Sequence, residues 1–370
     1  MKCYQCTPVL LFVLYAQFLS NVYCQFIKLH LSKTYCVDFC LSNSYIYSLF
    51  LDLQLTTIGL DSSVGNYLQP INTISFPHRI YYHSKCHLTS VYQHTLTFGA
   101  YFRNEGNVLG LGRQLNPHEY NYSIIHALHD QHIIDSNVFA LELSSNDNKH
   151  FLYLGNVPSN ETSKYTTKST FTVNQAPPSV YNSTWSIYAD GLRYQNKYHN
   201  NFNKTIIFTL NGESMIISKD VHEWFVSNIF DLFIKDKKCA VEQQINWYFY
   251  VCDADVYDKL SPIQFIQGKT VFEYTIRDDG SGKADIAYNP YLDLTNHSIY
   301  LRVGAFREKV VTFDLDKQVI EVYSNTSLGK VNVKDSISNV SIVVCIVGIF
   351  GLMNNICLYI FKLNGSYIYY

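Results

Sequence analysis

The feature that most constrains this chain is a strand–turn–strand pattern that occurs twice. In residues 204–218 (KTIIFTLNGESMIIS), two apolar β-type runs meet at the polar hinge 211–213, which contains an Asn-Gly turn signal. Residues 55–70 (LTTIGLDSSVGNYLQP) have the same form, because an apolar strand runs into an Asp-Ser-Ser turn that begins at Asp61. Each unit is followed by an apolar segment that ends in a glycine turn, at 107–112 and 300–306. This repetition predicts two related lobes.

Composition limits the classes of protein that the chain can belong to. A length of 370 residues is enough for two ordinary domains with a large core. Hydrophobic residues make up 47% and charged residues 16%, which excludes a disordered chain. The formal net charge of -2 gives no reason to expect nucleic acid as a partner. The 31 Tyr and 23 Phe against 9 Pro favour a β-rich body.

Apolar segments near both ends predict a secreted or membrane-attached protein. Residues 1–24 have the form of a secretory signal peptide, with an uncleaved signal anchor as the alternative. Residues 340–361 carry no charge and are long enough to form a transmembrane helix, although they include two Asn. Together these segments predict a single-pass type I protein of the secretory pathway or cell surface. Its body is lumenal or extracellular, its bilayer contact is 340–361, and 362–370 form a short cytosolic tail.

The cysteines and glycosylation sequons agree with that compartment. Cys239 and Cys252 bracket a strand-like run and are predicted to form a disulfide. Cys86 pairs with Cys36 or Cys40, and metal binding through the latter two is the less favoured alternative. Asn-X-Ser/Thr sequons suited to glycosylation occur six times, at Asn121, Asn160, Asn182, Asn203, Asn296 and Asn325.

Apolar periodicity predicts further elements along the chain. Residues 45–60 are strand-like and lead into the Asp61 turn, whereas 121–134 and 221–233 have helical spacing. Residues 139–143 and 151–155 form a hairpin, and the polar stretch 159–181 connects the two lobes. The 121–134 helix carries His126, His129, Asp130 and His132. We interpret this face as solvated, and we predict no metal or cofactor.

In this order and spacing, the segments resemble the pepsin-like aspartic proteases over roughly residues 45–323. In that family each lobe has an apolar strand that runs into Asp-Thr-Gly, and a later hydrophobic-hydrophobic-Gly segment crosses beneath it. The resemblance implies a mostly β, bilobal fold with two β-barrel lobes related by a pseudo-twofold axis, which we divide as 25–173 and 174–333. The C-terminal transmembrane helix would be additional.

The resemblance also implies where the catalytic pair would lie. The chemistry requires two aspartates that share a proton, one acting as base on a water while the other polarises the scissile carbonyl. Asp61 matches the first aspartate of the family pattern, whereas Leu210 stands where the second belongs. Asn211 also replaces the family's hydroxyl residue. Glu213 is the alternative source of a displaced second carboxylate, although catalytic geometry tolerates displacements of only about 1 Å.

The interval between 70 and 108 is shorter than the family's flap region, and Tyr81, Tyr82 and Tyr92 lie in no recognisable flap motif. We therefore expect a catalytically inactive, membrane-anchored pseudoprotease that keeps an interlobe cleft for a peptide or protein ligand. The alternative is an aspartic-type endopeptidase that acts through Asp61 and a rearranged second acid.

Overall fold

The structure is a computed structural model of the chain. It describes residues 26–42, 45–56, 58–61, 70–76, 79–87, 93–103, 106–113, 123–144, 149–174, 184–290 and 297–325. The predicted leader 1–24, the apolar segment 340–361 and the tail 362–370 all lie outside these residues. No helix in the described part of the chain has the length and apolar character needed to cross a bilayer.

The described chain is mostly β, as the sequence predicts, and two of its sheets repeat one arrangement. The amino-terminal sheet has the order β2-β3-β8-β4-β7-β6-β5, and the carboxy-terminal sheet has the order β12-β15-β22-β16-β21-β18-β17. In both sheets the second and third strands of the order are parallel, and the third and fourth are antiparallel. In both, the fourth and fifth are parallel again. The repetition inferred from sequence is therefore present in the strand order.

The strands of the amino-terminal sheet, in sheet order, are β2 (Cys36–Ser42), β3 (Tyr45–Asp52), β8 (Val108–Gly110), β4 (Ile58–Asp61), β7 (Gln93–Arg103), β6 (Arg79–His87) and β5 (Pro70–Phe76). Those of the carboxy-terminal sheet are β12 (Trp185–Ala189), β15 (Lys204–Phe208), β22 (Ser298–Leu301), β16 (Met215–Ile217), β21 (Lys283–Tyr288), β18 (Trp247–Cys252) and β17 (Cys239–Gln244).

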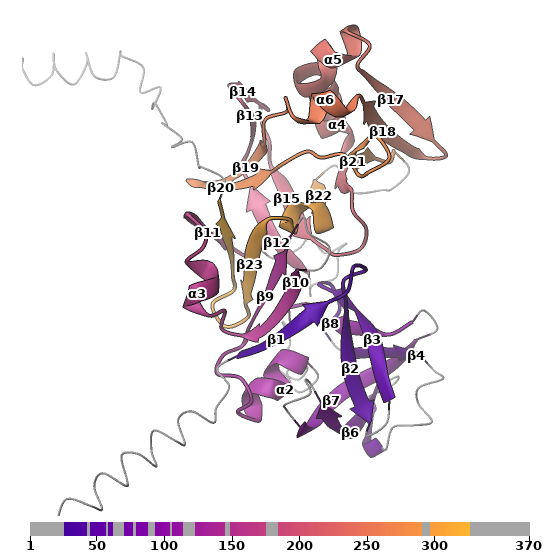
Figure 1. The fold of residues 1–370 in the computed structure, drawn as a ribbon, viewed down its shortest axis with the longest axis vertical. Helices are drawn as coiled ribbons and strands as arrows, with labels where there is room; N and C mark the ends of the chain where they lie inside the picture. Colours follow the sequence, from indigo (N-terminus) through magenta and orange to yellow (C-terminus); the bar gives the residue numbers. More distant parts are fainter. Residues whose placement is uncertain are drawn as a thin grey trace, which may run out of the picture. The chain divides into compact units, whose positions relative to one another are not determined.

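A third sheet, the shared sheet, combines strands from distant parts of the chain. Its order is β1 (Phe26–Leu31), β10 (His150–Gly155), β9 (Val138–Leu143), β23 (Lys309–Asp314), β24 (Val319–Ser324) and β11 (Thr167–Thr172). The hairpin predicted for 139–143 and 151–155 is β9–β10. Figure 1 shows β9 beside β23 at the centre of this sheet, and the two strands pair antiparallel.

A fourth, smaller sheet and several short helices complete the described chain. The sheet has the order β14 (Lys197–Tyr198), β13 (Gly191–Tyr194), β19 (Ile263–Gln267) and β20 (Thr270–Tyr274). The helices are α2 (Ile124–Asp130), α3 (Ser159–Thr162), α4 (Lys219–Phe225), the π-helix η3 (Val226–Phe230), α5 (Asp231–Lys235), α6 (Ala254–Tyr257) and the 3-10 helix η4 (Val303–Phe306). The helices predicted within 121–134 and 221–233 are confirmed, whereas the stretch 159–181 contains α3 and β11 as well as connecting residues.

Aromatic side chains of both halves fill the core beneath the shared sheet. The rings of Phe139 and Phe313 stack with centroids 4.7 Å apart, and Trp185 lies 5.1 Å from Phe313. The buried indole of Trp185 donates a 2.8 Å hydrogen bond to the carbonyl of Leu111. Offset and tilted aromatic pairs of this kind contribute about 1 kcal/mol each beyond the area that they bury. They join the two seven-stranded sheets through one core.

The cysteine predictions have two outcomes. Cys239 and Cys252 form a disulfide between β17 and β18, with an S–S distance of 2.05 Å, so this prediction is confirmed. Cys36 is a buried free thiol. Of the two partners expected for Cys86, Cys36 is therefore excluded: its sulfur is buried and lies against the hydroxyl and carbonyl oxygens of Thr34. The side chains of Cys40 and Cys86 lie outside what the structure describes.

Candidate functional site: two matching turns

Each seven-stranded sheet contains one turn that a later strand braces. In the amino-terminal sheet, β3 runs into a turn and returns as β4, with β8 lying between the two strands. In the carboxy-terminal sheet, β15 and β16 enclose β22 in the same way. This is the arrangement that the family resemblance implies for the two catalytic aspartates. The residues at corresponding places in the two turns therefore define the candidate site.

Strand register fixes which residues correspond. Val108 of β8 pairs with Phe50 on one side and Gly59 on the other. Tyr300 of β22 pairs with Ile207 and Ile216 in the same manner. Phe50 therefore corresponds to Ile207, and Gly59 corresponds to Ile216. Counting three residues onward from Phe50 and from Ile207 gives Leu53 and Leu210, and the two turns have equal length.

Hydrogen bonds within the turns support this correspondence. The carboxylate Oδ1 of Asp52 accepts the N–H of Gln54 at 2.7 Å and that of Leu55 at 3.3 Å. In the other turn, the hydroxyl of Thr209 accepts the N–H of Asn211 at 3.2 Å. A short polar side chain that bonds backbone N–H groups two residues onward forms a turn without glycine or proline. Asp52 and Thr209 therefore have the same structural role.

Glycines in the bracing segments let the backbone approach both turns closely. The N–H of Gly112 donates to the Leu55 carbonyl at 2.6 Å, and a Cβ at Gly112 would lie 2.8 Å from that oxygen. The N–H of Gly304 donates to the Glu213 carbonyl at 3.4 Å. A Cβ at Gly304 would lie 2.8 Å from a carboxylate oxygen of Asp285. Both segments were predicted from sequence as apolar runs that end in a glycine turn.

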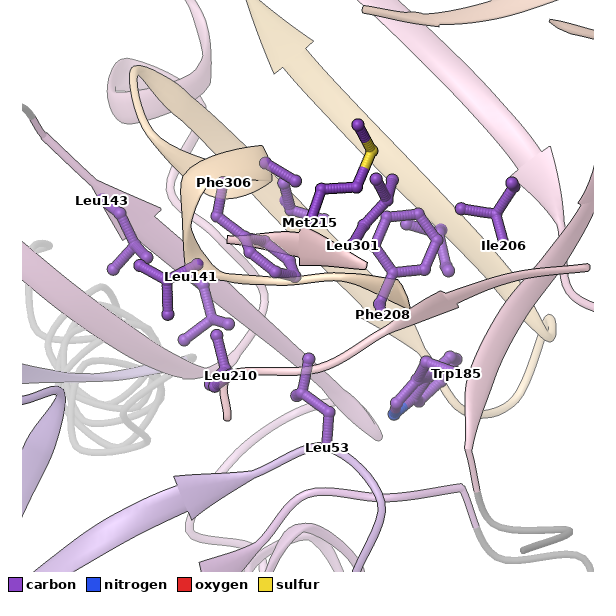
Figure 2. Close-up of a cluster of buried hydrophobic side chains, with 14 of the residues drawn as sticks. Leu53, Leu141, Leu143, Trp185, Ile206, Phe208, Leu210, Met215, Leu301 and Phe306 are labelled. Atoms are coloured by element: carbon purple, nitrogen blue, oxygen red, sulfur yellow. The ribbon is translucent and has the colours of Figure 1, made fainter. Parts of the chain in front are cut away.

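The equivalent turn positions hold leucine in both sheets. Leu53 is fully buried and Leu210 is 7% exposed, and both belong to the same hydrophobic cluster. Figure 2 shows the two side chains entering this cluster from different segments, together with Leu141, Trp185 and Phe306. An alkyl side chain carries neither a proton to share nor a hydrogen-bond acceptor, and an apolar site of this kind excludes water. Both leucines therefore lie in an apolar environment.

The placement of Asp61 predicted from sequence is therefore wrong. Asp61 is the last residue of β4, beyond the turn, and its backbone pairs with Arg103 of β7. By strand order β4 corresponds to β16, so Asp61 lies eight residues after the position that matches Leu210. The run predicted as one strand over 45–60 is two strands, because Asp52 forms a turn between them.

Glu213, the alternative acid, is already engaged by two partners. One carboxylate oxygen accepts a 3.4 Å hydrogen bond from the Tyr35 hydroxyl, and the other lies 2.9 Å from Nη2 of Arg307. Glu213 is 46% exposed, so this ion pair contributes only about 0.5 kcal/mol. Its carboxylate is thus held by Arg307 and Tyr35.

The remaining predicted site residues lie away from the turns. The described sequon residues Asn160, Asn203 and Asn325 are exposed, whereas the other three fall outside the described residues. Between residues 70 and 108 the structure describes the β5–β6 hairpin and β7, whereas the side chains of Tyr81 and Tyr82 are not described and Tyr92 lies outside the described residues. Within the described ranges, no three His, Cys, Asp or Glu side chains gather in an arrangement that could hold a metal ion. The α2 histidines belong to no such group.

One buried acid near the turns was not singled out from sequence. Asp285 of β21 is 4% exposed, and burial raises the pKa of its carboxyl to about 6. Its Oδ1 accepts the N–H of Arg277 at 2.9 Å, whereas Oδ2 is buried and has no hydrogen-bond partner among the described residues. Register pairs Met215 with Ile286 and Ile58 with Ala100, so Asp285 corresponds to Gly99 in the amino-terminal sheet.

The structure has two turns of equal length, each braced by a glycine-bearing segment, and a shared sheet joins the two halves. These features place the chain in the class of β proteins with two related halves. A family profile described as eukaryotic aspartyl protease matches residues 83–278, which is more than half of the chain. The chain belongs to this family. The matched range begins after Asp61 and contains Leu210.

Solved structures with this fold resemble the chain over most of its length. An aspartic proteinase from Irpex lacteus superposes with a TM-score of 0.59 at 14% identity, covering 82% of this chain and 99% of its own. The basic 7S globulin from soybean superposes with a TM-score of 0.60 at 10% identity, covering 82% of this chain and 96% of its own. At these identities the likeness concerns the fold alone. Comparison with curated protein sequences gives no significant match.

Proposed function

We propose that this chain is a noncatalytic member of the eukaryotic aspartyl protease family that binds a peptide or protein between its two halves. The observation that carries the proposal is the leucine at both equivalent turn positions, Leu53 and Leu210. Peptide hydrolysis by a carboxylate pair needs one acid and one base that share a proton and hold a water. Neither turn supplies either group at that position.

Because an acid is missing at both Leu53 and Leu210, we expect the chain to be inactive as a peptidase. If one aspartate remained, a single carboxylate could still bind a water, although it could not also donate a proton. With leucine at both positions, neither step has a group to perform it. Other residues at the turns keep the fold in place, including Asp52, Thr209 and the glycines of the bracing segments. One solved structure with this fold, the soybean basic 7S globulin, is described as a globulin and not as a proteinase.

The proposal includes membrane attachment through 340–361, with the body on the non-cytosolic side. The support is the uncharged run of spanning length behind a leader of signal-peptide form. The disulfide between Cys239 and Cys252 and the exposed sequon residues suit an oxidising, glycosylating compartment. Carbonate extraction with protease protection on microsomes tests this topology. Release into the supernatant, or digestion of the body from the cytosolic side, would contradict it.

The decisive experiment is hydrolysis of an unstructured protein substrate by the purified full-length chain, measured from acid to neutral pH. We expect no cleavage by the wild-type chain and none by Leu210→Asp, because the other half still offers Leu53. Asp61→Ala and Glu213→Gln serve as matched variants. Cleavage by wild type that disappears in either variant would overturn the proposal and favour an endopeptidase with a rearranged pair of acids.

A further inference from the structure

The bracing segments of the two halves differ at one position. Register makes Gly110 of β8 correspond to Arg302, the residue that follows β22. The amino-terminal half thus has no side chain where the carboxy-terminal half has a guanidinium. Arg302 follows Leu301, which lies in the hydrophobic cluster of Figure 2. A cation therefore lies next to the turn that in an active protease would carry an acid.

The guanidinium packs against Gly212 at the tip of the turn. A Cβ built at Gly212 would lie 2.6 Å from Nη1 of Arg302, so the guanidinium lies where a side chain at this position would project. Gly212 has φ +93, a conformation that favours glycine. Residues 211–213 are exposed, whereas Arg302 is partly buried. Nη1 of Arg302 is therefore close to a surface turn, while the stem of the side chain is covered.

Arg302 lacks the partner that a partly buried arginine normally has. Among the described residues its guanidinium forms no ion pair and no hydrogen bond, and its Nε is fully buried without an acceptor. Burial lowers the pKa of Arg302, with no neighbouring carboxylate to raise it again. Removing a charge from water without a counter-charge is costly. A bound anion could supply the acceptor oxygens that the Arg302 guanidinium lacks.

The neighbouring turn adds backbone N–H donors, and the carboxylate of its one acid, Glu213, is held by other residues. The carbonyls of Gly212 and Glu213 accept the N–H groups of Val303 and Gly304. Within the described residues, the N–H groups of Gly212 and Glu213 themselves donate no hydrogen bond. The Glu213 carboxylate is held by Arg307 and Tyr35, and its pairing with them leaves Arg302 without an internal counter-ion.

We propose that Arg302 and the turn 211–213 form a subsite that binds a carboxylate group of the peptide or protein ligand. The planar guanidinium matches a carboxylate through two parallel hydrogen bonds, and the exposed backbone N–H groups can add to them. The site would thus have the charge opposite to that of a proteolytic pair, and it would select acidic ligands. The peptide nature of the ligand rests on the proposed function, whereas the anion site rests on Arg302 alone.

The test measures binding to the full-length chain by calorimetry with two pairs of probes. One pair is acetyl-Leu-Val-Glu-Val-Leu-amide and its Gln counterpart, and the other is glutarate and glutaramide. We expect wild type to bind the Glu peptide and glutarate roughly tenfold more tightly than their neutral counterparts, as for a charge-assisted hydrogen bond. Arg302→Met should remove this preference and Arg302→Lys should keep part of it.

A matched control separates the site from the net charge of the protein. Arg193→Met removes one positive charge from β13, where Arg193 bonds Gln264 and Tyr198, and it should leave the preference intact. Thermal unfolding of each variant confirms that it is folded. A preference that survives Arg302→Met would overturn the inference, as would the absence of binding by all four probes.

Further outcomes distinguish this inference from the proposed function. If both peptides bind equally to wild type and to Arg302→Met, the carboxylate site is wrong and the peptide-binding function stands. If glutarate binds through Arg302 but neither peptide binds, the site stands and the peptide ligand is wrong. Inorganic phosphate is a fifth probe. Tighter binding of phosphate than of glutarate through Arg302 would replace the carboxylate by a phosphate ligand and overturn the assignment.

Discussion

The turn after β3 and the turn after β15 have the same length and are braced in the same way, but different residues hold them. In the first, a carboxylate from Asp52 accepts two backbone N–H groups and Gly112 packs against the Leu55 carbonyl. In the second, the Thr209 hydroxyl accepts one N–H, and Gly212 adopts a positive φ beside Arg302. The residue at the centre of each turn is leucine. The comparison teaches that the scaffold depends on the residues around the catalytic position and not on an acid within it.

The largest expected effect comes from restoring acids to the two turns. Leu53→Asp places a carboxylate in a site that is fully buried among hydrocarbon side chains, and should lower the free energy of unfolding by about 5 kcal/mol. Leu210→Asp should cost less, because Leu210 retains some exposure. Urea unfolding of both variants, with Leu53→Ala at about 3 kcal/mol as the reference for lost packing, checks this order. Leu53→Asp with wild-type stability would show that the site admits water.

The next effect concerns the buried carboxyl of Asp285, which has no counterpart at the equivalent position of the amino-terminal sheet. Burial raises the pKa of Asp285 to about 6, from 3.8 in the unfolded chain, whereas Gly99 occupies the equivalent place in the other sheet. Below pH 3.8 the carboxyl is protonated in both states and adds no penalty. Between 3.8 and 6 only the unfolded chain ionises, so the free energy of unfolding should fall by about 3 kcal/mol as pH rises.

Asp285→Asn removes this titration. Urea unfolding at several pH values should therefore show no such fall between pH 3.8 and 6 for the variant. Asp258→Asn, which changes an exposed carboxylate, should keep the wild-type slope. A slope that persists in Asp285→Asn would assign the effect to another group.

The two bracing glycines should differ in their tolerance of a methyl group. At Gly112 the added Cβ would meet backbone atoms of Leu55 and Gln54 at 2.8 and 2.9 Å, and these cannot move without shifting the turn. Gly112→Ala should therefore cost about 2 kcal/mol. At Gly304 the nearest atoms belong to the side chains of Asp285 and Tyr274, so Gly304→Ala should cost less. The reverse ranking in thermal unfolding would contradict the contrast between the two turns.

The smallest effect is expected for the polar residues that shape the turns. Asp52→Ala removes the acceptor of two N–H groups, and Thr209→Val removes the acceptor of one. The first should lower the free energy of unfolding by about 1.5 kcal/mol and the second by about 1 kcal/mol. Asp52→Asn keeps an acceptor oxygen and should recover most of the loss. Equal losses for the two changes would mean that the turns are held by packing alone.

Much of the fold could be predicted from the sequence, because it depends on periodicity and turn chemistry. The carboxy-terminal strand–turn–strand unit, the β9–β10 hairpin, the helices and the Cys239–Cys252 disulfide all follow from local patterns. The first of the two equivalent turn positions could not be identified in this way. Residues 53–57 contain no Gly, Pro or Asn, whereas the Asp-Ser-Ser after β4 has the composition of a turn.

The missing information was long-range pairing. Only the register of β8 against β3 and β4 shows that Leu53, and not Asp61, corresponds to Leu210. One sequence signal did exist, since Asp52 ends an apolar run and an aspartate there can form a turn with its own side chain. Arg302 was also visible within the predicted glycine-turn segment. Its lack of a partner depends on neighbours from distant segments, so only the structure reveals it.

The shared sheet also constrains when this protein can fold. At the centre of this sheet, β9 pairs with β23, so that Leu141 lies opposite Val311, which is 170 residues later in the chain. A chain that emerges from its amino terminus can pair β1, β10 and β9 early, but β9 keeps a bare edge until β23 arrives. An exposed edge is a template for pairing with other chains. During synthesis the first half therefore carries an aggregation hazard that ends only when nearly all of the described body has been made.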